Sequence, residues 1–212
     1  MSFPWHEFDV TGWLPEGWQD DVTAIADEAE CRAFPRTPGL SREAQDVAGV
    51  LRGRVHADQV LRGLPWLYRL YRGRFLKLVA STCTETVRPA ADDRYGVVLN
   101  VQHGTDMRFE CHVDSNPLTG LLFLTHHAAG GELVFARDED ADSVAAVERD
   151  CVIIHPRAGL LICFDGRRRP HYARALRSDS DVRVVAVMNF YTESYPESTR
   201  PRELNRHLYG DD

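Results

Sequence analysis

The strongest constraint on the fold is a series of short apolar runs in the second part of the chain. From about Arg94 onward, runs rich in Val, Leu, Ile and Phe alternate with Gly, Asp, Asn and Pro. They span residues 95–102, 107–114, 118–125, 131–136, 151–155, 159–164, 171–176 and 182–191. Strands of this length and spacing predict an antiparallel sandwich or a jelly roll of about eight strands.

The first part of the chain has a different periodicity. Apolar residues recur at helical spacing in two stretches, residues 22–29 and 64–79. Between them, Pro35 and Pro38 exclude a continuous helix, and Ser41 predicts the start of a short helix over 42–52. We therefore expect an α+β protein whose N-terminal helices pack on one face of the jelly roll.

Length and composition suit one domain. The 212 residues are 43% hydrophobic, which suffices for a sizeable core. We expect a single domain over 1–212, with a helical part at 1–90, the jelly-roll core at 91–195 and a C-terminal tail at 196–212. The net charge of -7 argues against nucleic acid and anionic membranes as partners, because their binders concentrate Lys and Arg.

The cysteines and the N-terminus indicate the compartment. The five cysteines include no C-x-x-C pair, so neither a disulfide framework nor a zinc knuckle is predicted. No apolar run is long enough to cross a bilayer, and the first residues lack the charged and apolar regions of a signal peptide. We expect a cytoplasmic protein with reduced thiols.

Two histidines and an aspartate form a candidate metal site. On a strand, His112 and Asp114 face the same way because side chains alternate. By itself this pattern is more typical of a surface or core histidine beside a solvated aspartate. His171, at the start of a later predicted strand, adds a second imidazole. Two imidazoles and one carboxylate form the facial triad of non-haem Fe(II) oxygenases, which leaves coordination positions open.

Arg183 is a candidate anion-binding residue on the last predicted strand. Its neighbours over 182–187 are almost all Val and Ala, which is typical of a strand buried on both faces. A buried arginine needs a partner, because an unpaired charge is costly in an apolar environment. The guanidinium fork suits a carboxylate in a dry pocket. The alternative is a surface arginine on an edge strand.

Taken together, these motifs resemble a known family. They are His112-Val113-Asp114, Leu121-Leu-Phe-Leu124, Gly130-Gly131-Glu132-Leu133, Gly159-Leu-Leu-Ile-Cys-Phe164, His171 and Arg183. The set resembles the Fe(II)/2-oxoglutarate-dependent dioxygenases, in particular their prolyl-hydroxylase-like branch, over about residues 94–191. The resemblance implies a double-stranded β-helix, which is the jelly roll inferred above, with the metal in its open mouth.

The resemblance also implies roles for individual residues. His112, Asp114 and His171 correspond to the iron ligands and hence to the catalytic centre. Arg183 corresponds to the residue that pairs with the distal carboxylate of 2-oxoglutarate. The implied cofactors are Fe(II), 2-oxoglutarate and O2, with ascorbate as an expected stimulant, and the usual outcome is hydroxylation. The carboxylate at Asp114 argues against halogenation, since halogenating relatives lack it.

The sequence departs from the family pattern at the cosubstrate pocket. Many members have a tyrosine where Phe123 stands, so a hydroxyl partner is missing. Thr119 or Thr125, on the same predicted strand face, is expected to replace it, and Gln102 is expected to line the same pocket. The interval between His171 and Arg183 is also longer than is usual in this branch.

Two arginines are candidate substrate contacts. Arg108 and Glu110 share the predicted face of His112, so they either point toward substrate or form a structural ion pair. Arg169 belongs to a triple arginine before His171, which is either a solvated turn or an attractive surface for an acidic substrate.

Three hypotheses for function remain at this point. The first is hydroxylation of a small metabolite, such as an amino acid or a biosynthetic intermediate. The second is hydroxylation of a prolyl or other residue in a protein. The third is a non-catalytic cupin-like barrel that binds a metal or ligand, which the absence of a His-x-His motif disfavours. We expect a small-molecule substrate, and nothing in the sequence predicts an oligomeric state.

Overall fold

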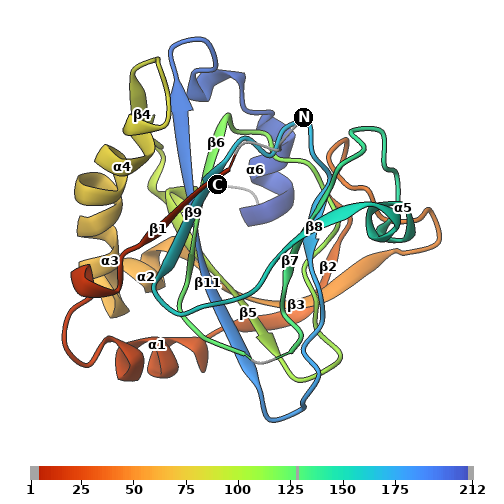
Figure 1. The fold of residues 1–212 in the computed structure, drawn as a ribbon, viewed down its shortest axis with the longest axis horizontal. Helices are drawn as coiled ribbons and strands as arrows, with labels where there is room; N and C mark the ends of the chain where they lie inside the picture. The colour runs from red at the N-terminus through yellow and green to blue at the C-terminus, as the bar shows by residue number, and fades with distance from the viewer. Residues whose placement is uncertain (1–4, 128, 210–212) are drawn as a thin grey trace.

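The computed structural model describes residues 5–127 and 129–209 of the chain. The last residues of the expected C-terminal tail, 210–212, lie outside this part, as do residues 1–4 and 128. A large antiparallel sheet and a small one pack against each other, and helices surround them (Figure 1). No helix in the described ranges is long and apolar enough to cross a membrane.

The large sheet has eight strands in the order β1-β9-β6-β11-β5-β3-β2, with β4 pairing to β11. The strands are β1 (Trp5–Asp9), β2 (Glu30–Pro35), β3 (Gly49–Val55), β4 (Val87–Pro89), β5 (Val97–His103), β6 (Leu118–Phe123), β9 (Leu160–Phe164) and β11 (Val182–Thr192). The small sheet has the order β10-β7-β8. Its strands are β7 (Leu133–Ala136), β8 (Cys151–Ile154) and β10 (His171–Ala173).

Most helices lie on one face of the large sheet (Figure 1). They are α1 (Trp18–Ala26), α2 (Ala57–Gly63), α3 (Pro65–Leu70) and α4 (Leu76–Ser81), with a π-helical turn (Tyr71–Phe75) joining the last two. Elsewhere lie α5 (Val144–Arg149), α6 (Arg202–Tyr209) and the 3-10 turns Thr11–Trp13, Asp93–Tyr95 and Glu197–Thr199. Buried helix residues such as Leu67 and Phe75 share one core with Leu99 and Ala186 of the sheet.

Strand alternation separates this core from the space between the sheets. On β6, Leu122 packs toward the helices and Leu121 toward the small sheet. On β11, Ala186 and Val185 divide in the same way. Arg183 is two residues from Val185, so its side chain enters the space between the sheets. The same alternation of side chains places the candidate residues on these strands in the space between the sheets.

The expected helix over 42–52 is wrong. Residues 42–48 form no helix, and β3 begins at Gly49 and pairs with β2, which the sequence analysis also missed. The physical reason lies at Glu43, whose buried carboxylate accepts hydrogen bonds from Arg108 and from the backbone N–H of Cys111. Glu43 therefore anchors a loop to a distant segment instead of starting a helix. The N-terminal part over 1–90 is thus not only helical.

The expected strand over 107–114 is also wrong as a continuous strand. Only His112 makes bridges, to His171 and to Ser41. The backbone N–H groups of this segment bond to several elements in turn, including Leu51 O, Ala173 O and Gly166 O. The segment 107–114 therefore bonds to several different elements instead of pairing along one neighbouring strand. The expected tail over 196–212 contains α6, and α5 follows the acidic loop 137–142, neither of which the sequence analysis expected.

Candidate metal centre

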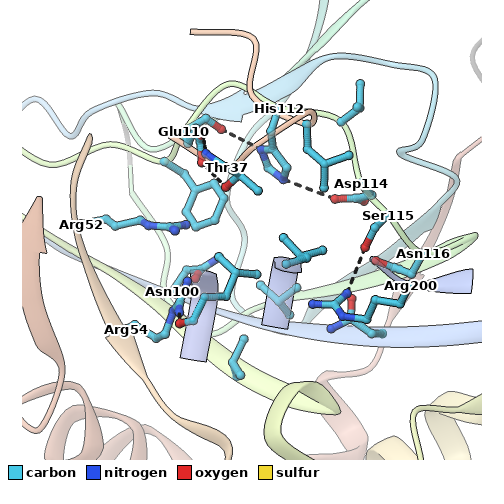
Figure 2. A pocket seen from close by; sticks show the side chains of 18 residues that line it. Thr37, Arg52, Arg54, Asn100, Glu110, His112, Asp114, Ser115, Asn116 and Arg200 are labelled. Atoms are coloured by element: carbon cyan, nitrogen blue, oxygen red, sulfur yellow. Dashed lines mark hydrogen bonds and ion pairs between the residues drawn. The ribbon is translucent and has the colours of Figure 1, made fainter. Parts of the chain in front are cut away.

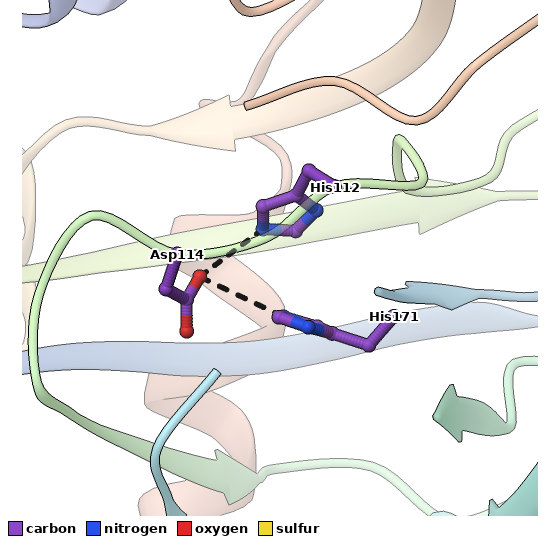
Figure 3. A group of neighbouring side chains, drawn as sticks. All are labelled: His112, Asp114 and His171. Atoms are coloured by element: carbon purple, nitrogen blue, oxygen red, sulfur yellow. Dashed lines mark ion pairs between the residues drawn. The ribbon is translucent and has the colours of Figure 1, made fainter. Parts of the chain in front are cut away.

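His112, Asp114 and His171 converge on one point (Figure 3). Their ligand atoms all lie within 4.8 Å of one another. The Nε2 atoms of His112 and His171 lie 3.3 and 3.6 Å from Asp114 Oδ1. Adjacent ligands on a metal with bonds of about 2.1 Å at right angles are about 3 Å apart. The three atoms are therefore spaced as three ligands on one face of an ion.

Backbone carbonyls fix the tautomers of both imidazoles. His112 Nδ1 is 2.8 Å from Glu110 O, and His171 Nδ1 is 2.8 Å from Arg169 O. A carbonyl oxygen can only accept, so each Nδ1 carries a proton and donates it. Each Nε2 is then left with a lone pair directed at the common point. This is how metal-binding histidines are commonly oriented.

The electrostatics of the triad favour an anionic carboxylate. Burial opposes ionisation of Asp114, but the two imidazoles and the Thr119 hydroxyl outweigh it and lower the pKa of Asp114 to about 2. Burial lowers the pKa of His171 to about 4. Burial acts in the same direction on His112, but the charges and hydrogen bonds of Asp114 and Glu110 raise its pKa. The triad thus combines the negative charge of Asp114 with the imidazole of His171, which is readily deprotonated.

A short hydrogen-bond chain holds the second oxygen of the aspartate. Thr119 Oγ1 donates to Asp114 Oδ2 at 2.6 Å and accepts from Asn116 Nδ2 at 2.9 Å. Oδ1 thereby remains directed at the histidines. Gly166 lies against the same carboxylate, since a Cβ at that position would stand 2.3 Å from Asp114 Oδ2. Gly166 and Asn116 were not predicted from the sequence, because no local motif marks either.

Arg183 is buried at the other end of the same interior, with 2% of its surface exposed. Its Nε donates to Gly131 O at 2.7 Å, and its guanidinium lies beside the Phe123 ring. Among the residues described, none places a carboxylate oxygen within 4.0 Å of it. Burial lowers the pKa of Arg183 to about 9, with Glu132 opposing the shift. Arg183 is therefore a buried cation whose charge an anion inside this space can compensate.

The triad and Arg183 line one cavity, which we call the inner cavity. Its walls come from Asn100, Phe109, His112, Asp114, Thr119, Leu121, Leu133, Phe164, His171, Tyr172, Ala173, Arg183, Val185 and Val187. Most of these side chains are apolar, so charges inside it interact strongly. The metal position and the guanidinium therefore border the same space.

The other expected cosubstrate contacts differ in position. Thr119 lines the inner cavity, but its hydroxyl is engaged by Asp114 and Asn116. Thr125 Oγ1 accepts a hydrogen bond from the backbone N–H of Val184. Thr125 is not among the described residues that line the cavity. Gln102 opposes Arg183 across the β5–β11 pairing, yet its amide donates to Met107 O and Arg174 O at 3.0 Å. Gln102 therefore ties segments together beside Arg183.

The two candidate substrate arginines are held by acids. Arg108 makes a bidentate pair with Glu43, at 2.6 and 2.7 Å. Arg169 binds Glu139 at 3.1 Å and the carbonyl of Arg137. Neither lines the inner cavity in the part of the chain described. Contact with substrate stays a sequence prediction for both, and the observed geometry is that of structural pairs.

A second pocket lies on the outer side of the triad, and we call it the outer pocket (Figure 2). Its polar walls are Thr37, Arg52, Arg54, Asn100, Glu110, His112, Asp114, Ser115, Asn116, Asn189 and Arg200. It shares Asn100, Phe109, His112, Asp114 and Val187 with the inner cavity. The sequence analysis missed its arginines, because they come from β3 and from the C-terminal segment, which carry no motif.

Several solved structures are similar to this chain over most of its length. The epimerase SnoN, which is non-haem, alpha ketoglutarate dependent and from nogalamycin biosynthesis, superposes with a TM-score of 0.63 at 16% identity over 98% of this chain and 86% of its own. SnoN has also been solved with Fe3+, alpha ketoglutarate and nogalamycin RO. The alpha ketoglutarate dependent carbocyclase SnoK gives a TM-score of 0.58 at 16% identity over 88% of this chain and 78% of its own.

A prolyl hydroxylase from Trichoplax adhaerens, solved with a peptide of hypoxia inducible factor, gives a TM-score of 0.58 at 14% identity over 90% of this chain and 84% of its own. No protein-family model and no curated protein matches the sequence. These likenesses confirm, at the level of a mixed α/β fold with a large antiparallel sheet, the expectation from the sequence motifs. The chain has the fold of the 2-oxoglutarate- and Fe(II)-dependent oxygenases.

Proposed function

We propose that the protein is an Fe(II)- and 2-oxoglutarate-dependent oxygenase whose metal is held by His112, Asp114 and His171. The observation that carries this proposal is that the triad and the buried Arg183 line the same cavity. A metal site alone is common to many reactions. A metal site that shares a largely apolar cavity with a buried arginine fits a ligand with a metal-binding end and an anionic end.

The donor set fits Fe(II). Two neutral imidazole nitrogens and one carboxylate oxygen, with further positions open, are the ligands of non-haem Fe(II) oxygenases. The Nδ1 hydrogen bonds of both histidines support this assignment, because they keep the Nε2 lone pairs available. The Asn116–Thr119 chain supports it from the carboxylate side.

Arg183 fits the distal carboxylate of 2-oxoglutarate. Its fork can make two charge-assisted hydrogen bonds, and the apolar walls exclude the water that would compete. Gly131 is part of this site because a Cβ there would stand 2.8 Å from Arg183 Cδ. The φ of +68° at Gly131 is a further reason for glycine at this position. Thr119 takes the place of a cosubstrate hydroxyl partner only if it turns from Asp114.

The protein's own groups then have distinct tasks. Iron and 2-oxoglutarate, when bound, supply activation of O2, with succinate and CO2 as products. The triad fixes the metal on one side and leaves the other side open. Arg183 orients the keto acid, and Phe123, Phe164 and Val185 exclude water from it. Substrate approaches from the outer pocket, which borders His112 and Asp114.

We also assign the sheets to a jelly roll. Along the chain, β5, β6, β9 and β11 of the large sheet are interleaved with the bridge at His112 and with the small-sheet strands, of which β7 and β8 are consecutive. Four core strands in each sheet, counting that bridge, is the arrangement of an eight-strand double-stranded β-helix. The triad then stands at one end of the space between the sheets.

Among reaction outcomes, we propose hydroxylation of a small metabolite, such as an amino acid or a biosynthetic intermediate. Leu204 and Leu208 of α6 line the outer pocket, which favours an enclosed small molecule over a peptide chain. Hydroxylation of a prolyl or other protein residue remains the second candidate, supported by the likeness to a prolyl hydroxylase. SnoN and SnoK, an epimerase and a carbocyclase, show that this fold serves other outcomes too.

The test is formation of succinate from 2-oxoglutarate by the purified protein, with free amino acids and prolyl peptides offered side by side. We expect succinate only with Fe(II) and O2, and a stimulation by one substrate class. Full turnover in the presence of a strong chelator would refute the proposal. Metal binding without any binding of 2-oxoglutarate would favour the non-catalytic cupin-like alternative.

A further inference from the structure

Three arginine side chains line the outer pocket. Arg52 and Arg54 of β3 enter it from one side, and Arg200 enters from the segment that precedes α6 (Figure 2). Their exposed fractions are only 3%, 4% and 9%. Buried arginines are rare unless a partner anion or an aromatic surface compensates their charge.

Aromatic rings lie beside all three guanidinium groups. The guanidinium of Arg52 lies 4.3 Å from the centre of the Phe109 ring, and that of Arg54 lies 4.7 Å from that of Phe34. The guanidinium of Arg200 stacks at 4.1 Å on the ring of Tyr95. Stacking of this kind supports a cation and leaves its N–H edge available.

Arg200 has the clearest geometry of the three. Its Nε donates to Asn205 Oδ1 at 2.7 Å and its Nη1 donates to Ser115 Oγ at 3.0 Å. Within residues 5–127 and 129–209, no carboxylate oxygen lies within 4.0 Å of its guanidinium. Arg200 is therefore held in place by neutral partners and retains donors for an anion.

The acids of the outer pocket are committed elsewhere. Glu110 accepts from the backbone N–H and the hydroxyl of Thr37 at 2.8 and 2.7 Å. Asp114 belongs to the metal triad. A divalent metal there adds further positive charge. Arg200 and a bound divalent metal therefore both favour a negatively charged guest.

The remaining walls are apolar. Leu40, Val98, Val113 and Val187 line the outer pocket, and Leu204 and Leu208 of α6 close it. Arg54 also donates to Leu208 O, which ties α6 over the pocket. A guest that fits these walls has an apolar body as well as an anionic group.

We propose that the outer pocket binds the substrate as a small organic carboxylate with an apolar body. Arg200 receives the carboxylate, and α6 covers the apolar part. The substrate carbon to be oxidised then faces the open side of the triad at His112 and Asp114. This inference rests on the proposed oxygenase function and names its substrate class.

The test compares carboxylates with amides of the same shape. Benzoate and benzamide, phenylacetate and phenylacetamide, and hexanoate and hexanamide are titrated by calorimetry into the anaerobic protein loaded with Fe(II) and saturating 2-oxoglutarate. We expect at least one carboxylate to bind roughly ten- to a hundredfold more tightly than its amide, since a charged hydrogen bond is lost with the amide. The preference should shrink in higher salt.

Variants locate that preference. Arg200→Gln should remove most of it and Arg200→Lys should retain part, because lysine keeps the charge without the fork. Arg62→Gln is the matched control, since Arg62 is an exposed arginine on α2 that pairs only with Asp58 among the described residues. It should leave the preference unchanged. Circular dichroism checks the folding of each variant. If a variant does not fold, the comparison of carboxylates with amides on the wild-type protein still tests the proposal.

The outcomes separate this inference from the oxygenase proposal. No carboxylate preference in any pair, or a preference unchanged in folded Arg200→Gln, overturns the substrate class while binding of 2-oxoglutarate still supports the oxygenase. Failure of the wild-type protein to bind 2-oxoglutarate in the presence of Fe(II) refutes the oxygenase itself, and the substrate class with it.

Discussion

The inner cavity and the outer pocket border the same two triad residues but are built differently. Apart from Phe109 and the triad residues His112 and Asp114, the inner cavity has walls from the strands of the two sheets, and it holds one cation, Arg183, in mostly apolar surroundings. The outer pocket is formed largely by loops, with further residues from β3, β5, β11 and α6, and three arginines line it. Rigid strands suit a ligand that never changes, and loops suit a ligand that distinguishes one enzyme from its relatives.

The largest expected effect comes from removing the group that both regions share. Asp114→Ala deletes the only carboxylate of the triad, so Fe(II) binding and succinate formation should fall to background. Metal content after gel filtration and a succinate assay measure the two effects. Asp58→Ala, at an exposed position on α2, is the matched control. If the folded Asp114→Ala variant bound as much iron as the wild-type protein, the metal would have to lie elsewhere.

Arg183→Ala should affect only the inner cavity. Truncating one partner of a buried charge pair costs about 2 to 5 kcal/mol, which corresponds to a rise of roughly thirtyfold to a few thousandfold in the 2-oxoglutarate requirement. Fe(II) binding should persist, because Arg183 is no ligand. Arg183→Lys should recover part of the loss. If the folded Arg183→Ala variant required no more 2-oxoglutarate for half-maximal activity than the wild-type protein, Arg183 would not bind the cosubstrate.

Thr119→Val tests whether the hydroxyl orients the aspartate. Losing a hydrogen bond to a metal-binding carboxylate typically costs ten- to a hundredfold in metal affinity. Thr119→Ser should keep most of the affinity, because it preserves the hydroxyl that donates to Asp114 Oδ2. If Thr119 instead contacts 2-oxoglutarate, the valine variant will raise the cosubstrate requirement and leave the affinity for Fe(II) unchanged.

The smallest expected effect is the pH dependence of metal binding. Iron requires both Nε2 atoms without protons, and the pKa of His112 is raised above its usual value of 6.5. As pH falls through that pKa, the apparent affinity for Fe(II) should fall by about tenfold per pH unit. The pKa of His171 is about 4, so a second proton should compete only near that pH. Loss of two protons per iron at neutral pH would contradict this assignment.

The sequence predicted the inner cavity better than the outer pocket for a physical reason. Alternation along β6 and β11 places Thr119 and Arg183 on the inner face from local pattern alone. The outer pocket depends on contacts between distant segments, such as Glu43 with Arg108 and Arg54 with α6. No periodicity encodes these contacts. For the same reason β2, β3 and α6 were missed, whereas strands from 118 onward lie close to the expected runs.

The most direct test of the central claim is a crystal structure grown without O2 in the presence of Fe(II) and 2-oxoglutarate. We predict anomalous density for one iron bonded at about 2 Å to His112 Nε2, Asp114 Oδ1 and His171 Nε2. The distal carboxylate of 2-oxoglutarate should lie on the guanidinium of Arg183 inside the inner cavity. Iron away from the triad, or the keto acid bound to Arg200 in the outer pocket, would contradict the division of the two regions.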